Sequence, residues 1–407
     1  MLAAAWQGKN TITVVEIPKP QVINASDVVV KVTGTTVCDN DLLLFNGTLS
    51  ELQIGDVLGH ECCGIVESIG PDITKVEKGQ RVMVSFPLAC GNCKRCKMQL
   101  YSHCEKASEN CITNASKGTR AVGGFDYSHF AGGFVGAQAE FVRVPYGDVN
   151  LLPIPDDVSD EKALYLSDVI GTAWHCVADT GIQEGDVVVV WGAGPVGQMC
   201  VDFGFFNGAS RVILIDGGDT AWRLGYVKSK IPVVEIIDFT GLPHGKSLSS
   251  HLVNIIGGEP DVFLECAGEE LIQYFGLHSN ALLEDKTNTT EVLNGMINGL
   301  RPFGRVGISG FYAGFTNHFD IGSLTRTGAR LIGNGQAPVQ KYWEGLLELV
   351  EQYEIDPLHM VSHRYRLEDI DKVYALLSRH EKGVQKVFLQ TRYSVSPSPG
   401  RPALTVL

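Results

Sequence analysis

Four closely spaced cysteines are the strongest chemical signal in the chain. They are Cys90, Cys93, Cys96 and Cys104, with two residues between each of the first three and seven before the last. Four thiolates can surround one tetrahedral Zn²⁺ and hold together a loop that has little core of its own. An iron–sulfur cluster is the alternative, but the familiar ferredoxin spacings do not match. Because four sulfur ligands leave no open coordination position, we expect a structural zinc site.

A glycine-rich segment directly after an apolar run predicts a dinucleotide site. The segment is Gly192-Ala193-Gly194-Pro195-Val196-Gly197, and the run before it is Val187–Trp191. The first glycine permits a tight turn, the second lets a pyrophosphate approach and the third lets the next helix pack on the strand. Asp216 follows Gly197 by 19 residues. A carboxylate there can bind the ribose hydroxyls and opposes a 2′-phosphate, which favours NAD over NADP.

Other potential metal ligands are scattered along the chain. They are Cys38, the pair His60-Glu61 and Asp168. Taken singly, each has an ordinary structural explanation, because a lone cysteine is usually a small core residue and an aspartate often caps a helix. Spacing alone therefore does not join these residues into a site.

The charge and cysteine content restrict the class of protein. The chain has 407 residues, with 46 acidic against 33 basic side chains, a net charge of −13 and 11 cysteines. The acidic excess argues against partners such as nucleic acid and anionic membranes, which need clustered Lys and Arg. No apolar run approaches the roughly 20 residues of a membrane span, and the start of the chain does not resemble a signal peptide. We therefore expect a cytoplasmic protein whose cysteines are thiols or metal ligands.

The pattern of apolar residues predicts an α/β protein with two domains. Short runs bounded by turn-forming residues make the first 150 residues β-rich. Residues 161–180 have helical spacing, and from there buried-strand runs alternate with helices, as in a doubly wound parallel sheet. Polar residues 269–290 are expected to form an insertion, and residues 394–407 a mobile tail.

The order of these features resembles the zinc-containing medium-chain alcohol dehydrogenases over residues 1–391. A narrower likeness, to the glutathione-independent formaldehyde dehydrogenases and dismutases, lies in residues 144–146, 150–152, 166–168, 321–324 and 335–342. The resemblance implies a GroES-like catalytic domain with two zinc sites, formed by residues 1–165 and 336–393. It also implies a Rossmann NAD-binding domain over residues 166–335.

The resemblance further implies roles for particular residues. Cys38, His60 and Asp168 would bind a catalytic Zn²⁺ with an open fourth position, and Glu61 would approach that metal during exchange of water or product. Asp41 would orient His60, and Thr172 would pack on the nicotinamide. The implied reaction is hydride transfer between NAD and a small primary alcohol, aldehyde or aldehyde hydrate. In this reaction zinc would lower the pKa of the substrate oxygen that it binds. Relatives of this kind are homodimers or homotetramers.

Two positions depart from the family pattern. Asn40 and Leu43 stand where relatives have a Ser or Thr and, often, a His that carry the alcohol proton outward. Asn40 could bind the substrate oxygen while water or Glu61 moves the proton, or Leu43 and Phe45 could shape an apolar pocket for a specialised substrate. We favour these two explanations together. The alternatives are a dismutase or other redox-neutral enzyme that retains its NAD, and a catalytically silent NAD- or zinc-binding protein.

A third departure is Asp39, where several relatives have a basic residue near the pyrophosphate. An acidic side chain there would either weaken cofactor binding or point to solvent, and we expect it to point to solvent.

Overall fold

The chain folds as two compact units. The computed structural model describes residues 1–47, 52–107, 124–125, 133–241, 248–268, 290–312, 318–397 and 402–407. Met1–Gly171 and Pro338–Leu407 form the first unit, and Thr172–Ala337 form the second. Residues 166–171, expected in the nucleotide-binding domain, thus belong to the first unit. The expected insertion over residues 269–290 lies almost entirely outside the described residues.

The first unit is built on strands, which confirms the β-rich half of the predicted fold. A seven-stranded sheet has the order β14-β15-β3-β4-β5-β7, with β6 paired to β3. Valines dominate β3, and those at 28, 30 and 32 alternate onto one buried face. The strand bounds are β3 Val28–Thr35, β4 Cys62–Ile69, β5 Arg81–Val84, β6 Phe141–Val144, β7 Leu151–Pro153, β14 Val361–Arg366 and β15 Lys386–Gln390. A separate antiparallel pair consists of β1 Leu2–Gly8 and β2 Thr11–Glu16.

Short helices and turns connect these strands. They are α1 Asp39–Phe45, α2 Lys94–Lys97, α4 Gly147–Asn150, α5 Asp160–Ala163, α13 Trp343–Glu351 and α14 Ile370–Ser378. One apolar cluster places α14 and α1 in the same core, where the rings of Phe45 and Tyr374 lie 4.9 Å apart.

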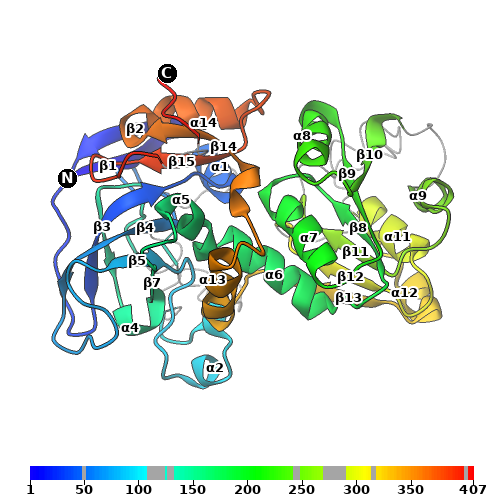
Figure 1. Cartoon of the computed structure of the whole chain (residues 1–407), viewed down its shortest axis with the longest axis horizontal. Helices are drawn as coiled ribbons and strands as arrows, with labels where there is room; N and C mark the ends of the chain where they lie inside the picture. Colours follow the sequence, from blue (N-terminus) through cyan, green and yellow to red (C-terminus); the bar gives the residue numbers. More distant parts are fainter. Residues whose placement is uncertain are drawn as a thin grey trace. The chain divides into compact units, whose positions relative to one another are not determined.

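The second unit is a parallel sheet with connecting helices (Figure 1). The strand order is β10-β9-β8-β11-β12-β13, so the direction of winding reverses between β8 and β11. The strands are β8 Val187–Trp191, β9 Arg211–Asp216, β10 Glu235–Asp238, β11 Val262–Glu265, β12 Arg305–Ile308 and β13 Arg330–Gly333. The helices that follow them are α7 Pro195–Phe206, α8 Trp222–Lys230, α9 Leu248–Ile256, α11 Thr290–Gly299 and α12 Ile321–Thr327, and α6 Val169–Thr180 precedes the sheet. The predicted doubly wound fold is confirmed, and ligands of such sheets bind at the point of reversal.

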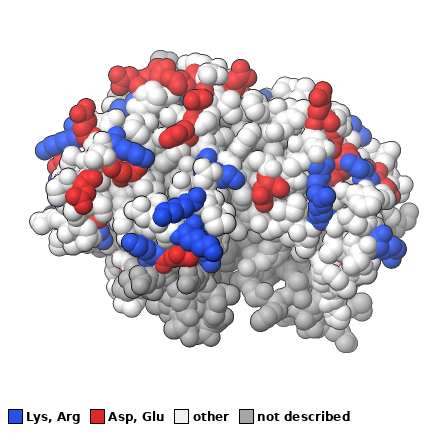
Figure 2. Space-filling view, turned by 90° about the horizontal axis from the view of Figure 1, so that it is seen from below, with Lys and Arg blue, Asp and Glu red and all other residues white. Residues whose placement is uncertain are grey.

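The surface of the described residues carries both signs of charge. On the face shown in Figure 2, Lys and Arg side chains form small groups, and Asp and Glu side chains lie among them and along one edge. No helix in the described ranges combines the length and apolar character that crossing a bilayer requires.

The tail that the sequence predicts to be mobile makes specific contacts at its described residues. Arg364 in β14 donates from Nη2 to the carbonyl of Val395 at 2.6 Å, and the amide of Thr405 donates to the carbonyl of Arg364 at 2.7 Å. The Arg364 guanidinium also donates to Gln390 Oε1 at 2.7 Å and pairs with the buried carboxylate of Glu161. Arg364 is 1% exposed and Glu161 is 3% exposed, so this ion pair is desolvated.

Replacing Arg364 with alanine leaves a buried carboxylate without its partner. We expect Arg364→Ala to lower the free energy of unfolding by about 3–5 kcal/mol, measured by urea denaturation followed through tryptophan fluorescence. Arg366→Ala is the matched control, because Arg366 lies in the same strand but is exposed, and it should change stability by at most ~0.5 kcal/mol. Equal midpoints for the two variants would contradict the prediction.

Candidate metal centres and nucleotide site

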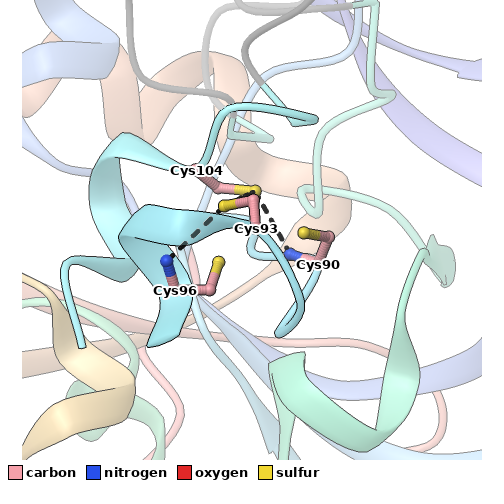
Figure 3. Close-up of side chains that lie close together, drawn as sticks. All are labelled: Cys90, Cys93, Cys96 and Cys104. Carbon is pink, nitrogen blue, oxygen red and sulfur yellow. Dashed lines mark hydrogen bonds between the residues drawn. The ribbon is translucent and has the colours of Figure 1, made fainter. Parts of the chain in front are cut away.

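The four-cysteine cluster lies in a loop of the first unit (Figure 3). The Sγ atoms of Cys90, Cys93, Cys96 and Cys104 all lie within 4.8 Å of one another. Cys93 precedes α2, Cys96 lies within it and Cys104 follows the short turn Tyr101–His103. The loop itself thus folds so that all four sulfurs face one point.

Backbone amides of the same loop donate to these sulfurs. The amide of Cys90 donates to Cys104 Sγ at 3.2 Å, and that of Cys96 donates to Cys93 Sγ at 3.5 Å. Burial opposes ionisation of Cys93, but hydrogen bonds from the amides of Cys96 and Glu105 lower the pKa of its thiol to about 6. Thiolates are the metal-binding form of cysteine, and four sulfurs that lie within 4.8 Å of one another fit a closed tetrahedral zinc ion.

A second group of potential ligands forms within the first unit. Cys38, His60, Glu61 and Asp168 each place one ligand atom within 4.8 Å of those of the others. His60 Nε2 lies 3.1 Å from Asp168 Oδ2 and 3.8 Å from Glu61 Oε1. Cys38 immediately precedes α1, and His60 and Glu61 precede β4. The group combines sulfur, nitrogen and oxygen donors, unlike the four-sulfur cluster.

Asp168 reaches this group because the backbone interrupts a helix there. The sequence predicts helical spacing over residues 161–180, but the structure has α5, a 3₁₀ turn over Leu164–Ser167 and then α6. Asp168 lies between the last two with φ −146° and ψ −73°, outside the helical region. The predicted continuous helix is therefore wrong at Asp168, and the break directs its carboxylate to His60.

Lys386 is a charged neighbour of this group that sequence reasoning missed. Its ammonium donates to Glu61 Oε1, and both side chains are almost fully buried. Burial alone would lower the pKa of Lys386, but the charges of Glu61 and Cys38 raise it above its ordinary value. Burial raises the pKa of Glu61 above its ordinary value, and it raises the pKa of Cys38 to about 11. The positive charge of Lys386 opposes both shifts in part. Glu61 Oε2 has no hydrogen-bond partner among the described residues, so one carboxylate oxygen remains available to a cation.

A hydrogen-bonded group that includes Asp41 lies on the other side of the His60 ring. Asp41 Oδ1 lies 4.0 Å from His60 Nδ1, and Asp41 Oδ2 accepts from the amide of Cys38 at 2.8 Å. Gln138 donates to the same Asp41 oxygen at 3.1 Å and accepts from the Tyr374 hydroxyl at 2.9 Å. Asp41 thus lies near His60, its expected role in orienting that ring stays a prediction, and Gln138 is a second residue that the sequence did not reveal.

The positions that depart from the family pattern lie on α1. Asn40 and Leu43 are partly buried, and Asp39 is exposed, which agrees with its expected orientation toward solvent. Phe45 is 6% exposed and packs in the core against Tyr374. Its ring joins α1 to α14, and its expected place in the wall of a substrate pocket stays a prediction. Thr172, the expected nicotinamide neighbour, is partly buried in α6 and belongs to the second unit.

The glycine-rich turn of the second unit connects β8 to α7. Gly192 has φ 103°, and a Cβ there would lie 2.8 Å from that of Ala267. A Cβ on Gly197 would lie 1.8 Å from the Gly192 carbonyl, so both positions require glycine. Gly194 is the N-cap of α7, with Pro195 and Val196 in its first turn. The nearest atom to a Cβ on Gly194 would be Arg223 Nη1 at 3.8 Å, so this side of the turn has room for a phosphate near the helix N-terminus.

Asp216 ends β9 and binds the same turn. Its Oδ2 accepts from the amide of Ala193 at 2.7 Å, and its Oδ1 accepts from the amide of Gly217 at 2.7 Å and the Thr220 hydroxyl at 2.6 Å. The side chain is 1% exposed. Asp216 therefore has a structural role, in addition to the ribose contact that the sequence predicts.

Arg223 is a third residue that sequence reasoning missed. It lies in α8 with Nη1 on the open side of Gly194, and its Nε is buried without a hydrogen-bond partner among the described residues. A guanidinium beside a glycine-rich turn can pair with a phosphate. The sequence signal was a basic residue soon after the acidic end of β9, which is too common to be specific.

Comparison with known proteins assigns the chain to a family. The alcohol dehydrogenase GroES-like domain matches residues 24–156. A zinc-type alcohol dehydrogenase-like protein of Bacillus subtilis is 33% identical over 394 residues, which cover 96% of this chain and 100% of the relative. A similar protein of Schizosaccharomyces pombe is 30% identical, with 95% and 90% covered. The glutathione-independent formaldehyde dehydrogenase of Pseudomonas aeruginosa is 30% identical, with 94% and 96% covered.

The fold agrees with these relatives. The structure of the alcohol dehydrogenase TADH from Thermus sp. ATN1 superposes with a TM-score of 0.81 at 28% identity, covering 96% of this chain and 100% of that one. The sequence identity with each of these proteins extends over nearly the whole chain, and both the GroES-like unit and the dinucleotide-binding unit are present. The chain therefore belongs to the zinc-containing medium-chain alcohol dehydrogenase family.

Proposed function

We propose that this protein is an oxidoreductase that transfers a hydride between NAD and a primary alcohol or an aldehyde hydrate. Zinc and NAD are its cofactors. The observation that carries the proposal is the mixed group of Cys38, His60, Glu61 and Asp168, whose ligand atoms lie within 4.8 Å of one another. With Cys38, His60 and Asp168 as the three ligands, one position is left for substrate, as in catalytic rather than structural zinc sites.

The charges of the group fit a divalent cation. Cys38, Asp168 and Glu61 carry up to three negative charges when ionised, and Lys386 offsets one of them. A divalent ion offsets the other two, which removes most of the cost of burying these charges together. When bound, zinc lowers the pKa of the substrate oxygen and NAD accepts the hydride.

The chain's own residues hold the metal and orient its ligands. Cys38, His60 and Asp168 hold the metal, and Asp41 with Gln138 fixes the ring of His60. Lys386 holds Glu61 beside the three ligands. From there the Glu61 carboxylate can approach the metal when water or product exchanges. Asn40 stands two residues from Cys38 on α1. Its amide can donate a hydrogen bond to a substrate oxygen, but it cannot relay a proton as a hydroxyl does.

The direct test is a screen for NADH formation from primary alcohols and aldehydes, with secondary alcohols as the comparison. We expect turnover with primary substrates, lost after treatment with a zinc chelator and restored by zinc. Cys38→Ser should abolish it, because serine is a poor ligand for zinc. The proposal fails if zinc-loaded protein gives no NADH from any primary alcohol or aldehyde, whether or not it oxidises secondary alcohols.

A second candidate is an aldehyde dismutase or another redox-neutral enzyme that retains its NAD. The partly buried amide of Asn40 in place of a hydroxyl favours it, because such an enzyme has less need to release a proton outward. Denaturing freshly purified protein distinguishes the two candidates. Nicotinamide in the supernatant together with turnover in the absence of added NAD would favour the dismutase.

The two groups of ligands should lose zinc independently. We expect about two zinc ions per chain, measured by mass spectrometry of the metal content. Asp168→Ala should lose one ion and the activity, because it leaves two of the three proposed catalytic ligands. Cys104→Ser should lose the other ion and lower the thermal midpoint, because the loop then has no cross-link. An Asp168→Ala protein with both zinc ions and full activity would show that the ligand assignment is wrong.

Cofactor binding should depend on two residues with opposite charge, of which only Asp216 should affect the choice between NAD and NADP. Asp216→Asn should raise the Kd for NAD about ten- to hundredfold, because a hydrogen bond to a charged group is worth about 1.5–3 kcal/mol. The same variant should have a smaller preference for NAD over NADP. Arg223→Leu should weaken NAD and NADP alike if Arg223 contacts a phosphate that both share. Lys230→Gln is the matched control, since Lys230 is exposed at the end of the same helix. Equilibrium titration of NADH fluorescence measures each value, and an unchanged Kd for Asp216→Asn would contradict the ribose contact.

A further inference from the structure

Three cysteines that have no role in the sites above converge inside the second unit. Cys176 lies in α6, Cys200 in α7, and Cys266 directly after β11. Their Sγ atoms all lie within 4.8 Å of one another, and those of Cys200 and Cys266 are 3.7 Å apart. We refer to these three residues as the trithiol cluster.

Regular elements hold the trithiol cluster in place. The Cys200 thiol lies 3.7 Å from the carbonyl of Ala173, one turn before Cys176 in α6. The amide of Cys266 donates to the carbonyl of Trp191 at 2.8 Å, which fixes it to the end of β8. Cys176 and Cys200 are fully buried and Cys266 is partly buried. The sulfurs thus converge without any rearrangement of the fold.

The local hydrogen bonds favour a thiolate within the cluster. The thiols of Cys200 and Cys266 lie within hydrogen-bonding reach of Cys176, and so does the hydroxyl of Ser309. These bonds lower the pKa of Cys176 well below its ordinary value, although burial acts in the opposite direction. A buried thiolate that neighbouring S–H and O–H groups stabilise is a soft, preformed metal ligand.

We propose that Cys176, Cys200 and Cys266 form a third metal site, which binds one cuprous ion through three sulfur ligands. Soft thiolate ligands select monovalent copper, whereas structural zinc takes four ligands. Within the described residues this group contains no imidazole and no carboxylate ligand. Sulfurs about 2.3 Å from a central ion stand about 4 Å apart in a trigonal plane, which agrees with the observed separations. Binding releases the protons of the remaining thiols.

The experiment is a titration of the full-length, zinc-loaded, reduced protein with cuprous ion under anaerobic conditions, in competition with a cuprous chelator. We expect one cuprous ion per chain to bind without release of zinc. Cys176→Ser, Cys200→Ser and Cys266→Ser should each weaken that binding about a hundredfold or more, since even loss of a residue that only supports a ligand costs 10- to 100-fold. Cys63→Ser is the matched control, because it removes one buried thiol of the first unit and should leave copper binding unchanged.

Two further measurements keep the proposal falsifiable if a variant folds poorly. Retention of both zinc ions shows which variants are folded, and copper X-ray absorption on the unaltered protein counts the ligands directly. Three sulfurs at about 2.3 Å would support the site. Copper that enters only as zinc leaves, a third zinc ion in place of copper, or equal binding by the three variants and the control would overturn it, and the thiols would then be small core side chains.

Discussion

The ion pair between Glu61 and Lys386 is the interaction around which the first unit's metal group is arranged. A buried carboxylate beside a thiol and a second carboxylate is costly to desolvate, and a buried ammonium offsets part of that cost. The two residues are 325 positions apart in the chain. The sheet order β15-β3-β4 brings them together, because Lys386 begins β15 and Glu61 immediately precedes β4. The return of the chain after the second unit is therefore required for the charge balance of a site whose other members all precede the second unit.

The sequence predicted what local patterns encode. Spacing alone indicated the four-cysteine loop, because all its sulfurs lie within 15 positions, from Cys90 to Cys104. The sequence also predicted the glycine-rich turn. Its glycines are required by a positive φ angle and by close contacts within one strand–turn–helix unit. The doubly wound sheet and the family resemblance were confirmed for the same reason: they rest on runs of residues rather than on long-range contacts.

The rest depended on contacts between distant segments. Asp168 joins His60 only because a helix breaks, and periodicity over residues 161–180 gave no sign of that break. Lys386, Gln138 and Arg223 carry common side chains at positions without distinctive spacing, so their neighbours became known only with the fold. Phe45 packs in one core cluster with Tyr374, a long-range contact that its position in the sequence does not indicate. The roles of the individual ligands stay predictions until metal content is measured.

The contacts of the last residues have a consequence for self-association. Strand β14 lies at one end of the seven-stranded sheet, with β15 as its only strand neighbour within the described part of the chain. Such an edge offers unpaired N–H and C=O groups to another sheet. Here Leu404 forms a parallel bridge to Arg364, and the amide of Thr405 satisfies the Arg364 carbonyl. The last residues therefore pair with this edge at Arg364, where an unpaired strand edge would favour association with another sheet.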